Sequence, residues 1–454
     1  MSPIPVIAVF DIGKTNKKFF LFNEQYKIVL ERTVFFEETS DEDGFPCDDL
    51  PRMEQWALET IREVQDIKTF AVKALNVSAY GASFVLVGAG GVPVMPLYNY
   101  LKSYPQKLQQ QLHHAYGGET GFSLATASPA LGNLNSGLQL YRLKKEKNAV
   151  FDKVQYALHL PQYISYLFTH TACSDITSIG CHTALWDFTA GAYHAWVKQE
   201  GILSKLGPLF PGNGTMEADV NGSVIKTGAG LHDSSAALIP YLKNFSGPFI
   251  LLSTGTWCIS LNPFNEDPLT PEELQQDCLY YMRYDGHPVK ASRLFAGHEH
   301  EQQVKKLATH FGLPEDHYKK VLFDAALLAS LDRNGKNGFQ DSLHGSVFEQ
   351  RQLGLFGSYE QAYHQLVYDI MQQQHHSTSL VLGSTAPARI FVDGGFAQNP
   401  VYMNLLAAAF PEMEVFAASV SQASAIGAAL AIHECWNDKQ LPGDMVELKF
   451  YKSN

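Results

Sequence analysis

The chain reads VIAVFDIGKT over residues 6–15 and FILLSTGTWC over residues 249–258. Each stretch is a short apolar run that ends in a turn containing glycine and threonine. A second apolar run follows each turn, over Phe19–Phe22 in the first case and Trp257–Leu261 in the second. Short apolar runs bounded by turn residues are typical of buried strands. We therefore predict two β-meanders with Gly-Thr tips.

Later segments repeat this correspondence between the two halves. Residues 74–87 indicate two strands interrupted at Tyr80-Gly81, and residues 389–392 indicate a strand that leads into Asp393-Gly394-Gly395. A helix is expected from Pro400 to Phe410, with Asn399 as its N-cap. At 454 residues, the chain is also longer than one hydrophobic core usually organises. We predict a duplicated α/β fold of two domains with a central cleft, comprising residues 1–245 and 246–454.

The composition and charge of the chain argue against nucleic-acid-binding and membrane-spanning proteins. The chain is 45% hydrophobic and 18% charged, as expected of a globular protein. Its formal net charge is −12, and the basic face typical of nucleic-acid binding is missing from the sequence. No apolar run reaches the roughly 20 residues of a membrane span, and the first ten residues do not form a signal peptide. The six cysteines include no CxxC pair. We expect a cytoplasmic protein that binds neither nucleic acid nor membrane.

The two glycine-threonine turns are candidate phosphate sites. The common nucleotide motifs GxxxxGK[ST] and GxGxxG after a strand are absent from the sequence. Glycine allows close approach of the backbone to a phosphate, and backbone N–H groups and threonine hydroxyls bind its oxygens. Taken singly, each turn also fits an ordinary hairpin. Their matching positions raise phosphate binding to the same standing as the hairpin interpretation, and the candidate residues are Gly13, Thr15, Thr254, Gly255 and Thr256.

Two aspartates are candidate chemical groups. Asp11 precedes the first turn, where a carboxylate can hold Mg²⁺ through water or bond its own backbone. Asp233 fits a helix N-cap, and equally the carboxylate that phosphoryl transfer to an alcohol needs beside the attacking hydroxyl. His298-Glu299-His300 is interpreted as a polar loop or a helix start, because the i, i+2 spacing does not place both histidines on one helix face.

Taken together, these motifs resemble the FGGY family of carbohydrate kinases over nearly the whole chain. DIGKTNKK at 11–18 resembles the family's first phosphate motif, with Lys14 in place of a threonine and Lys18 at a commonly basic position. STGTW at 253–257 resembles the second phosphate motif, and DGGFAQNP at 393–400 the adenosine motif. GLHD at 230–233 matches the segment with the catalytic aspartate. Residues 163–187, with Asp175 and Thr177, resemble a helix–loop stretch of the first domain.

The resemblance implies an actin-like (ribonuclease H-like) fold, with the sugar bound by the first domain and ATP mainly by the second. It implies that Asp233 is the general base, that Mg²⁺ and both tips offset phosphate charge, and that Lys18 binds phosphate. The implied adenosine-binding residues are Gly394, Gly395 and Asn399. The implied sugar-binding residues are Tyr80, Gly81, Ala82, Asn99, His232 and Asp233, and the small size of Gly81 and Ala82 leaves room there.

The substrate expected from the resemblance is a ketose such as L-rhamnulose, L-fuculose or a pentulose, and a homodimer is compatible with the sequence. One alternative is an actin-like ATPase without a sugar acceptor, which the GLHD segment argues against. Another is a non-catalytic regulator that binds sugar or nucleotide. Retention of Asp11, Thr15, Thr256 and Asp233 argues against it. A glycoside hydrolase needs two facing carboxylates, which the sequence does not assign.

Overall fold

The computed structural model describes residues 2–328, 331 and 345–452. The chain divides into two compact units. Unit 1 comprises residues 1–245, 280–288 and 421–445, and unit 2 comprises residues 246–279, 289–420 and 446–454. Neither unit is one continuous stretch, because two segments of the second half belong to unit 1. The domain roles assigned to residues 1–245 and 246–454 stay predictions.

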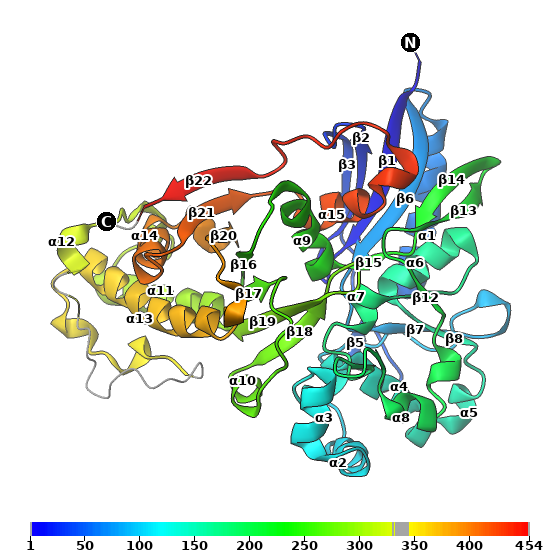
Figure 1. Ribbon diagram of the computed structural model, residues 1–454, viewed down its shortest axis with the longest axis horizontal. Helices are drawn as coiled ribbons and strands as arrows, with labels where there is room; N and C mark the ends of the chain where they lie inside the picture. The colour runs from blue at the N-terminus through cyan, green and yellow to red at the C-terminus, as the bar shows by residue number, and fades with distance from the viewer. Residues whose placement is uncertain (1, 329–330, 332–344, 453–454) are drawn as a thin grey trace. The chain divides into compact units, whose positions relative to one another are not determined.

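Unit 1 is built on a mixed sheet in the order β13-β14-β6-β1-β2-β3, with β15 paired to β6 (Figure 1). The predicted meander is its centre, since β1 pairs with β2 and β2 with β3, both antiparallel. Strand β6 runs parallel to β1, and β14 runs parallel to β6. The strands are β1 (Ile4–Ile12), β2 (Lys17–Asn23), β3 (Ile28–Val34), β6 (Phe70–Ala79), β13 (Thr215–Val220), β14 (Ser223–Gly228) and β15 (Leu231–His232).

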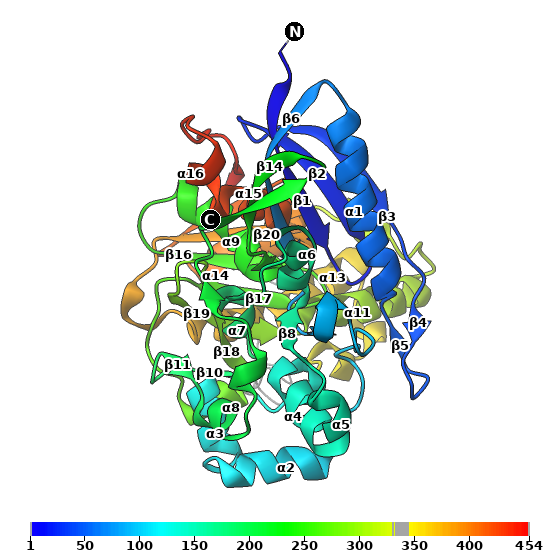
Figure 2. The same cartoon turned by 90° about the vertical axis from the view of Figure 1, so that its right-hand side faces the viewer.

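Helices cover both faces of this sheet (Figure 2). Alternate residues of β1, from Val6 to Ile12, join the core that includes Met53, Ala57 and Ile61 of one helix. Successive side chains of a strand point to opposite faces of the sheet. On the other face, Asn76 Nδ2 of β6 donates to Ala428 O. The first face is covered by α1 (Leu50–Asp66) and α6 (Leu160–Thr169), and the second by α9 (Asp233–Asn244) and α15 (Ala423–Ala431).

A second hydrophobic core lies within unit 1. It contains Phe84, Leu112, Phe122, Leu138 and Trp196. Its elements are β7 (Phe84–Val87), β8 (Tyr156–His159), α2 (Gln106–Ala115), α3 (Gly118–Thr126), α4 (Ser136–Glu146) and α8 (Ala195–Gln199). The predicted interruption at Tyr80-Gly81 is confirmed, because β6 ends at Ala79 and β7 begins at Phe84.

The second sheet has the order β18-β19-β17-β16-β20-β21-β22, and its strands from β19 to β22 repeat the arrangement of unit 1. Pairing is antiparallel along the β16-β17-β19 meander, parallel from β16 through β20 to β21, and antiparallel between β21 and β22. Each step has the same direction as its counterpart in unit 1. The strands are β16 (Phe249–Thr254), β17 (Cys258–Asn262), β18 (Cys278–Met282), β19 (Pro288–Leu294), β20 (Arg389–Gly394), β21 (Glu414–Ser419) and β22 (Glu447–Tyr451).

The core of unit 2 joins its sheet to three helices. Ile250, Leu252, Leu307, Tyr363 and Leu406 are all buried in it. The helices are α11 (Ala296–Phe311), α13 (Tyr359–Ser379) and α14 (Pro400–Ala409). The predicted N-cap at Asn399 is confirmed, since its side chain accepts from Val401 N and Tyr402 N. Among the residues described, no helix is long and apolar enough to cross a membrane.

Candidate active site

Three neighbouring strand ends of unit 1 bring the predicted chemical residues together. Ile12 of β1 lies in register with Ala79 of β6, and Ala79 lies in register with His232 of β15. All three strands are parallel, so Asp11, Tyr80 and Asp233 lie at one edge of the sheet. Ligands of open α/β sheets bind outside the carboxyl ends of the strands. This edge is therefore the candidate acceptor site.

Asp233 is the first residue of α9, and its side chain is 34% exposed. The N-cap interpretation of Asp233 is wrong, because His232 holds the cap position. Asp233 Oδ1 accepts from Ser234 N at 2.6 Å, one residue on, where a capping side chain would reach two or three residues on. Its Oδ2 accepts no hydrogen bond from a described residue. That oxygen is available to a ligand hydroxyl.

Asp11 lies beside Asp233 in a more enclosed position. Ser424 Oγ donates to Asp11 Oδ2 at 2.9 Å. Burial raises the pKa of Asp11 to about 6, and the negative charge of Asp233 adds to that shift. Two nearby carboxylates repel each other, and this repulsion raises the pKa of Asp11 further. A cation bound beside Asp11 would offset the same repulsion.

A buried chain of hydrogen bonds fixes the position of Asp233. The Thr177 hydroxyl donates to Asp175 Oδ1 and accepts from His232 N at 2.9 Å. Thr177 and Asp175 are both completely buried. Burial raises the pKa of Asp175 to about 7. Because His232 immediately precedes Asp233, this chain anchors the start of α9. The resemblance indicated Asp175 and Thr177, but their role could not be derived from the residue pattern.

The first predicted phosphate tip is a four-residue loop between Ile12 and Lys17. Gly13 N donates to Asn16 O across it, and Thr15 is exposed. Lys14, the departure from the family motif, pairs with Glu38 and Asp48 at 2.8 and 2.7 Å. Lys17 is buried and also pairs with Asp48. Lys18 Nζ donates to Gln422 Oε1 at 3.1 Å.

The expected room beside Gly81 does not exist. A Cβ atom at Gly81 would lie 2.2 Å from His232 Cδ2, so the imidazole of His232 fills that space. The glycine serves to admit this ring. Burial lowers the pKa of His232, although the charge of Asp233 opposes that effect. The neutral imidazole of His232 therefore lies between Gly81 and Asp233, with its Nε2 3.5 Å from Asp233 Oδ1.

Three other predicted sugar residues are occupied by protein contacts. Tyr80 is buried, and its hydroxyl donates to Asp48 Oδ2 at 2.8 Å. Asn99 donates to Pro46 O at 3.0 Å and accepts from Leu101 N at 3.0 Å, so its amide holds a loop. Ala82 is buried, and its carbonyl accepts from Gln139 Nε2. Asn99 and Ala82 thus shape the surroundings of the site through the backbone.

The second predicted tip, in unit 2, is a three-residue loop between Thr254 and Cys258. The buried Thr254 hydroxyl donates to Asp393 O at 2.6 Å and accepts from Phe396 N at 3.0 Å. Thr254 therefore joins the tip to the 393–396 turn. Thr256 is exposed, and its carbonyl accepts from His298 N at 3.1 Å.

Two glycines let other segments approach this tip. A Cβ atom at Gly297 would lie 1.7 Å from Gly255 O, and one at Gly394 would lie 1.9 Å from Thr254 O. Gly394 also has a φ of 91°, in the left-handed region that favours glycine. The role of Gly297 was missed from the sequence, since it lies 42 residues from Gly255 in a segment without a known motif. His298-Glu299-His300 is confirmed as a helix start, because α11 begins at Ala296.

A cavity of about 710 Å³ opens beside the second tip. Its wall includes Thr254, Gly255, Thr256, Gly395 and Asn399, which were all predicted to bind phosphate or adenosine. The sequence did not identify its second wall, which comes from α11 and the segment after it. That wall includes Gly297, His300, Val304, Lys305, Tyr318 and Lys319.

The floor of this cavity is rigidly hydrogen bonded. Asn399 Nδ2 donates to the Tyr363 hydroxyl at 2.8 Å, and His300 Nε2 lies 2.9 Å from the same oxygen. Burial lowers the pKa of His300 to about 4, so the ring is neutral at pH 7. Asn399 therefore contributes structure through its side chain. The cavity also presents charged groups, namely the acidic Glu301, Glu315 and Asp316 and the basic Lys305 and Lys319.

Sequence comparisons identify the family. Residues 6–209 match the N-terminal domain of the FGGY family of carbohydrate kinases, and residues 246–440 match the FGGY carbohydrate kinase C-terminal domain. The chain belongs to the FGGY family of carbohydrate kinases. It is a sugar kinase, and FGGY sugar kinases use ATP. Among curated proteins, no sequence matches this one.

Solved structures share the fold of this FGGY kinase. A carbohydrate kinase from Novosphingobium aromaticivorans has 24% identity and a TM-score of 0.81, over 99% of this chain and 95% of that one. Ligand-bound xylulose kinase from Lactobacillus acidophilus has 14% identity and a TM-score of 0.79, over 99% and 94%. Plasmodium falciparum glycerol kinase with ADP has 14% identity and a TM-score of 0.76, over 100% and 95%. The predicted duplicated, actin-like α/β fold is confirmed.

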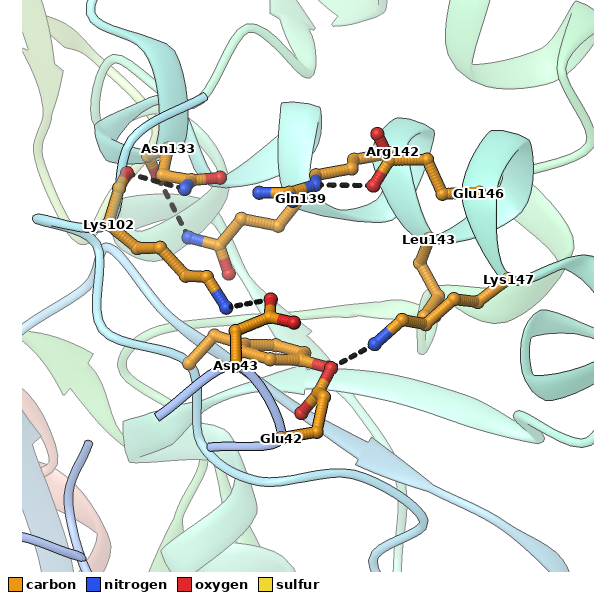
Figure 3. Close-up of a pocket in the computed structure, with 10 residues that line it drawn as sticks. Glu42, Asp43, Lys102, Asn133, Gln139, Arg142, Leu143, Glu146 and Lys147 are labelled. Carbon is orange, nitrogen blue, oxygen red and sulfur yellow. Dashed lines mark hydrogen bonds and ion pairs between the residues drawn. The ribbon is translucent and has the colours of Figure 1, made fainter. Parts of the chain in front are cut away.

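A second, smaller cavity of about 50 Å³ lies in unit 1 of the kinase (Figure 3). Its charged residues already bind one another. Lys102 Nζ pairs with Asp41 and Asp43, Lys147 pairs with Glu42, and Arg142 pairs with Glu146. Because these charges are compensated, the cavity has no excess charge with which to attract an ionic ligand.

Proposed function

We propose that this kinase transfers the γ-phosphoryl group of ATP to a hydroxyl of a ketose, with Asp233 as the general base. The position of Asp233 carries the proposal. It lies at the carboxyl end of the parallel strands beside Asp11, its side chain is 34% exposed, and no described residue donates a hydrogen bond to its Oδ2. A carboxylate so placed accepts the proton of an attacking hydroxyl, as phosphoryl transfer to an alcohol requires.

We propose separate roles for the residues around Asp233. The Asp175–Thr177 chain holds the start of α9, so Asp233 does not have to reorient as the hydroxyl approaches. The neutral His232 ring excludes water from one side of the carboxylate. The proton moves from the acceptor hydroxyl to Asp233 Oδ2 as the hydroxyl oxygen attacks the γ-phosphorus in line. The bond between the γ-phosphorus and the β,γ-bridging oxygen breaks, and ADP leaves with that electron pair.

Asp11 fits a role in binding Mg²⁺. Its oxygens are hard donors, its charge is destabilised by Asp233, and Ser424 fixes its orientation. Mg²⁺ keeps several waters and takes few protein ligands. The described residues contain no cluster of three or more acidic, histidine or cysteine side chains suited to a metal. Mg²⁺ bound there with the ATP phosphates would offset charge on the transferred group.

ATP binding in unit 2 is supported by the cavity beside the second tip. Its volume, about 710 Å³, suits a nucleotide-sized ligand. All four predicted residues line this cavity, and we propose that Thr256 and the backbone of Gly255 contact the phosphates and that Gly395 and Asn399 contact the nucleoside. In unit 1, Gly13, Thr15 and Lys18 are proposed to contact phosphate.

The substrate proposal is a ketose, with L-rhamnulose, L-fuculose and pentuloses as candidates. The acceptor edge presents neutral and hydrogen-bonding groups, and the anionic pair Asp11 and Asp233 disfavours an anionic sugar acid by repulsion. The structural neighbours include several xylulose kinases and also a gluconate kinase. A cytoplasmic location and a homodimer stay predictions.

The test is ADP release from the purified protein with Mg-ATP, across ketoses, polyols and aldoses. A control without sugar accompanies each measurement. We expect one or two ketoses to stimulate release strongly over the control. Release that does not depend on sugar would favour the actin-like ATPase instead. No release with any sugar, together with retained nucleotide binding, would favour the non-catalytic regulator.

A further inference from the structure

The loop that follows β7 carries two tyrosines with different surroundings. Tyr98 donates its hydroxyl to Glu42 at the rim of the small cavity. Tyr100, two residues later, makes no hydrogen bond to a described residue through its hydroxyl. The Asn99 amide between them holds the loop to Pro46 and Leu101. Tyr100 is thus presented on a fixed backbone with a free phenol group.

The ring of Tyr100 packs against the acceptor site. Its centroid lies 5.9 Å from that of Tyr80, with the two planes tilted by 59°. Tyr80 N donates to Ile12 O at the end of β1, and the neighbouring Gly81 touches His232, which precedes Asp233. The Tyr80 ring therefore links Tyr100 to the strand ends that carry the proposed base.

The charged groups around Tyr100 are also those of the acceptor site. Burial raises the pKa of Tyr100, the charge of Lys14 lowers it, and the charges of Asp233 and Asp48 raise it further. The phenol therefore stays neutral at pH 7 and lies within electrostatic reach of Asp233. Lys14 and the Tyr80 hydroxyl are both bound to Asp48, at 2.7 and 2.8 Å, which leaves Tyr100 as the uncommitted donor of this group.

We propose that the Tyr100 hydroxyl binds a hydroxyl group of the sugar acceptor and helps to determine acceptor specificity. This inference rests on the proposed ketose kinase function. A neutral phenol supplies one directional hydrogen bond and no charge, which suits a neutral polyhydroxylated acceptor. Asn99, the residue predicted from the sequence for this contact, instead positions the loop from which Tyr100 extends.

The test is Tyr100→Phe, which removes one oxygen and keeps the ring against Tyr80. With D-xylulose, D-ribulose, L-rhamnulose and L-fuculose as probes, we expect the acceptor KM to rise about fivefold for the sugars that the wild type uses, the loss of one neutral hydrogen bond. The kcat and the KM for ATP stay within about twofold. The matched control is Tyr98→Phe, whose lost hydrogen bond is to Glu42. It leaves the acceptor KM unchanged.

Monodeoxy analogues of the best acceptor sharpen the test. The analogue that lacks the contacted hydroxyl has the same KM with the wild type and with Tyr100→Phe, whereas the other analogues keep the difference. An unchanged acceptor KM in a Tyr100→Phe enzyme of wild-type thermal stability would overturn the assignment. A wild type that phosphorylates none of the sugars would contradict the proposed function itself, and this inference with it.

Discussion

The two units place the same pair of residue types at the same point of the sheet, in opposite order. In unit 1, Asp11 of β1 lies in register with Ser78 of β6. In unit 2, Ser253 of β16 lies in register with Asp393 of β20. The sheets share their strand order and directions, so these are equivalent positions. In unit 1 the carboxylate of Asp11 therefore lies next to the tip at residues 13–16. In unit 2 the carboxylate of Asp393 lies instead at the turn of residues 393–396, which is proposed to bind the nucleoside.

The tips that follow these positions are held in different ways. The unit 1 tip is braced by ion pairs, since Lys14 and Lys17 both bind Asp48. The unit 2 tip is braced by close backbone contacts at Gly297 and Gly394 and by the Thr254 hydroxyl. We expect the ion pairs of the unit 1 tip to suit a polar acceptor. The backbone contacts of the unit 2 tip place no long side chains beside it, which leaves space for a large ligand. We therefore expect the same strand arrangement to support two kinds of binding site.

The largest expected effect distinguishes the acceptor side from the nucleotide side. Asp233→Asn or Asp233→Ala should lower kcat by about 10²- to 10⁴-fold, because the general base is lost. ATP binding should stay largely intact, since the nucleotide cavity is lined by unit 2 residues. Steady-state kinetics and nucleotide titration measure the two effects. Ser234→Ala is the control, because it removes only the 3.3 Å hydrogen bond from Ser234 Oγ to Asp233 Oδ1 and keeps the backbone donor Ser234 N. Normal turnover in the Asp233 variants would reject the base assignment.

Asp11→Asn should weaken Mg²⁺ affinity about 10- to 100-fold, the effect typical of an outer-shell metal partner. Because the pKa of Asp11 is about 6, the wild type should lose apparent Mg²⁺ affinity as pH falls below 6, where Asp11 takes up a proton. The variant should show no such dependence on pH. Activity titrated with Mg²⁺ between pH 5 and pH 8 checks this.

Whereas Asp11→Asn should weaken Mg²⁺ binding, it should raise the thermal stability of the metal-free protein. A folded-state pKa raised from 3.8 to about 6 means that the buried charge costs stability as pH rises through that window. Without Mg²⁺, Asp11→Asn should therefore melt higher than the wild type at pH 8 and equally at pH 3.5. A lower melting temperature at pH 8 would contradict this account of Asp11.

Two close glycine contacts offer a matched comparison between the units. A Cβ atom at Gly297 would lie 1.7 Å from Gly255 O, and one at Gly427 would lie 1.8 Å from Ala236 O on the helix of the base. Such overpacking costs about 1–3 kcal/mol. Gly297→Ala should raise the KM for ATP about tenfold, and Gly427→Ala should lower kcat with little change in that KM. Equal kinetic effects of the two variants would argue against separate half-sites.

The smallest expected effect comes from the tip hydroxyls. Thr256→Val should raise the KM for ATP about threefold, the loss of one exposed hydrogen bond, with a smaller change for sugar. Thr15→Val tests the equivalent hydroxyl of the unit 1 tip, which is also exposed. An unchanged requirement for ATP in Thr256→Val would count against a phosphate role for the second tip.

Local patterns predicted the strands, both tips and the helix after Asn399, because short apolar runs and turn residues encode them within a few positions. The sequence could not reveal contacts between distant segments. The space at Gly81 is filled by His232, and Gly297 is needed by a carbonyl 42 residues away. Residues 421–445 join unit 1 for the same reason, since Gly427 of α15 packs on α9. Such packing depends on the fold as a whole.

We propose that the acceptor and the nucleotide bind to separate half-sites, one in each unit. Amide hydrogen exchange of the wild type with ADP alone, and with the best ketose alone, distinguishes these half-sites. We expect ADP to protect residues 254–257, 297–300 and 395–399, and the ketose to protect residues 80–82, 99–101 and 231–234. Protection of the unit 2 segments by the ketose, with none at 231–234, would contradict the account.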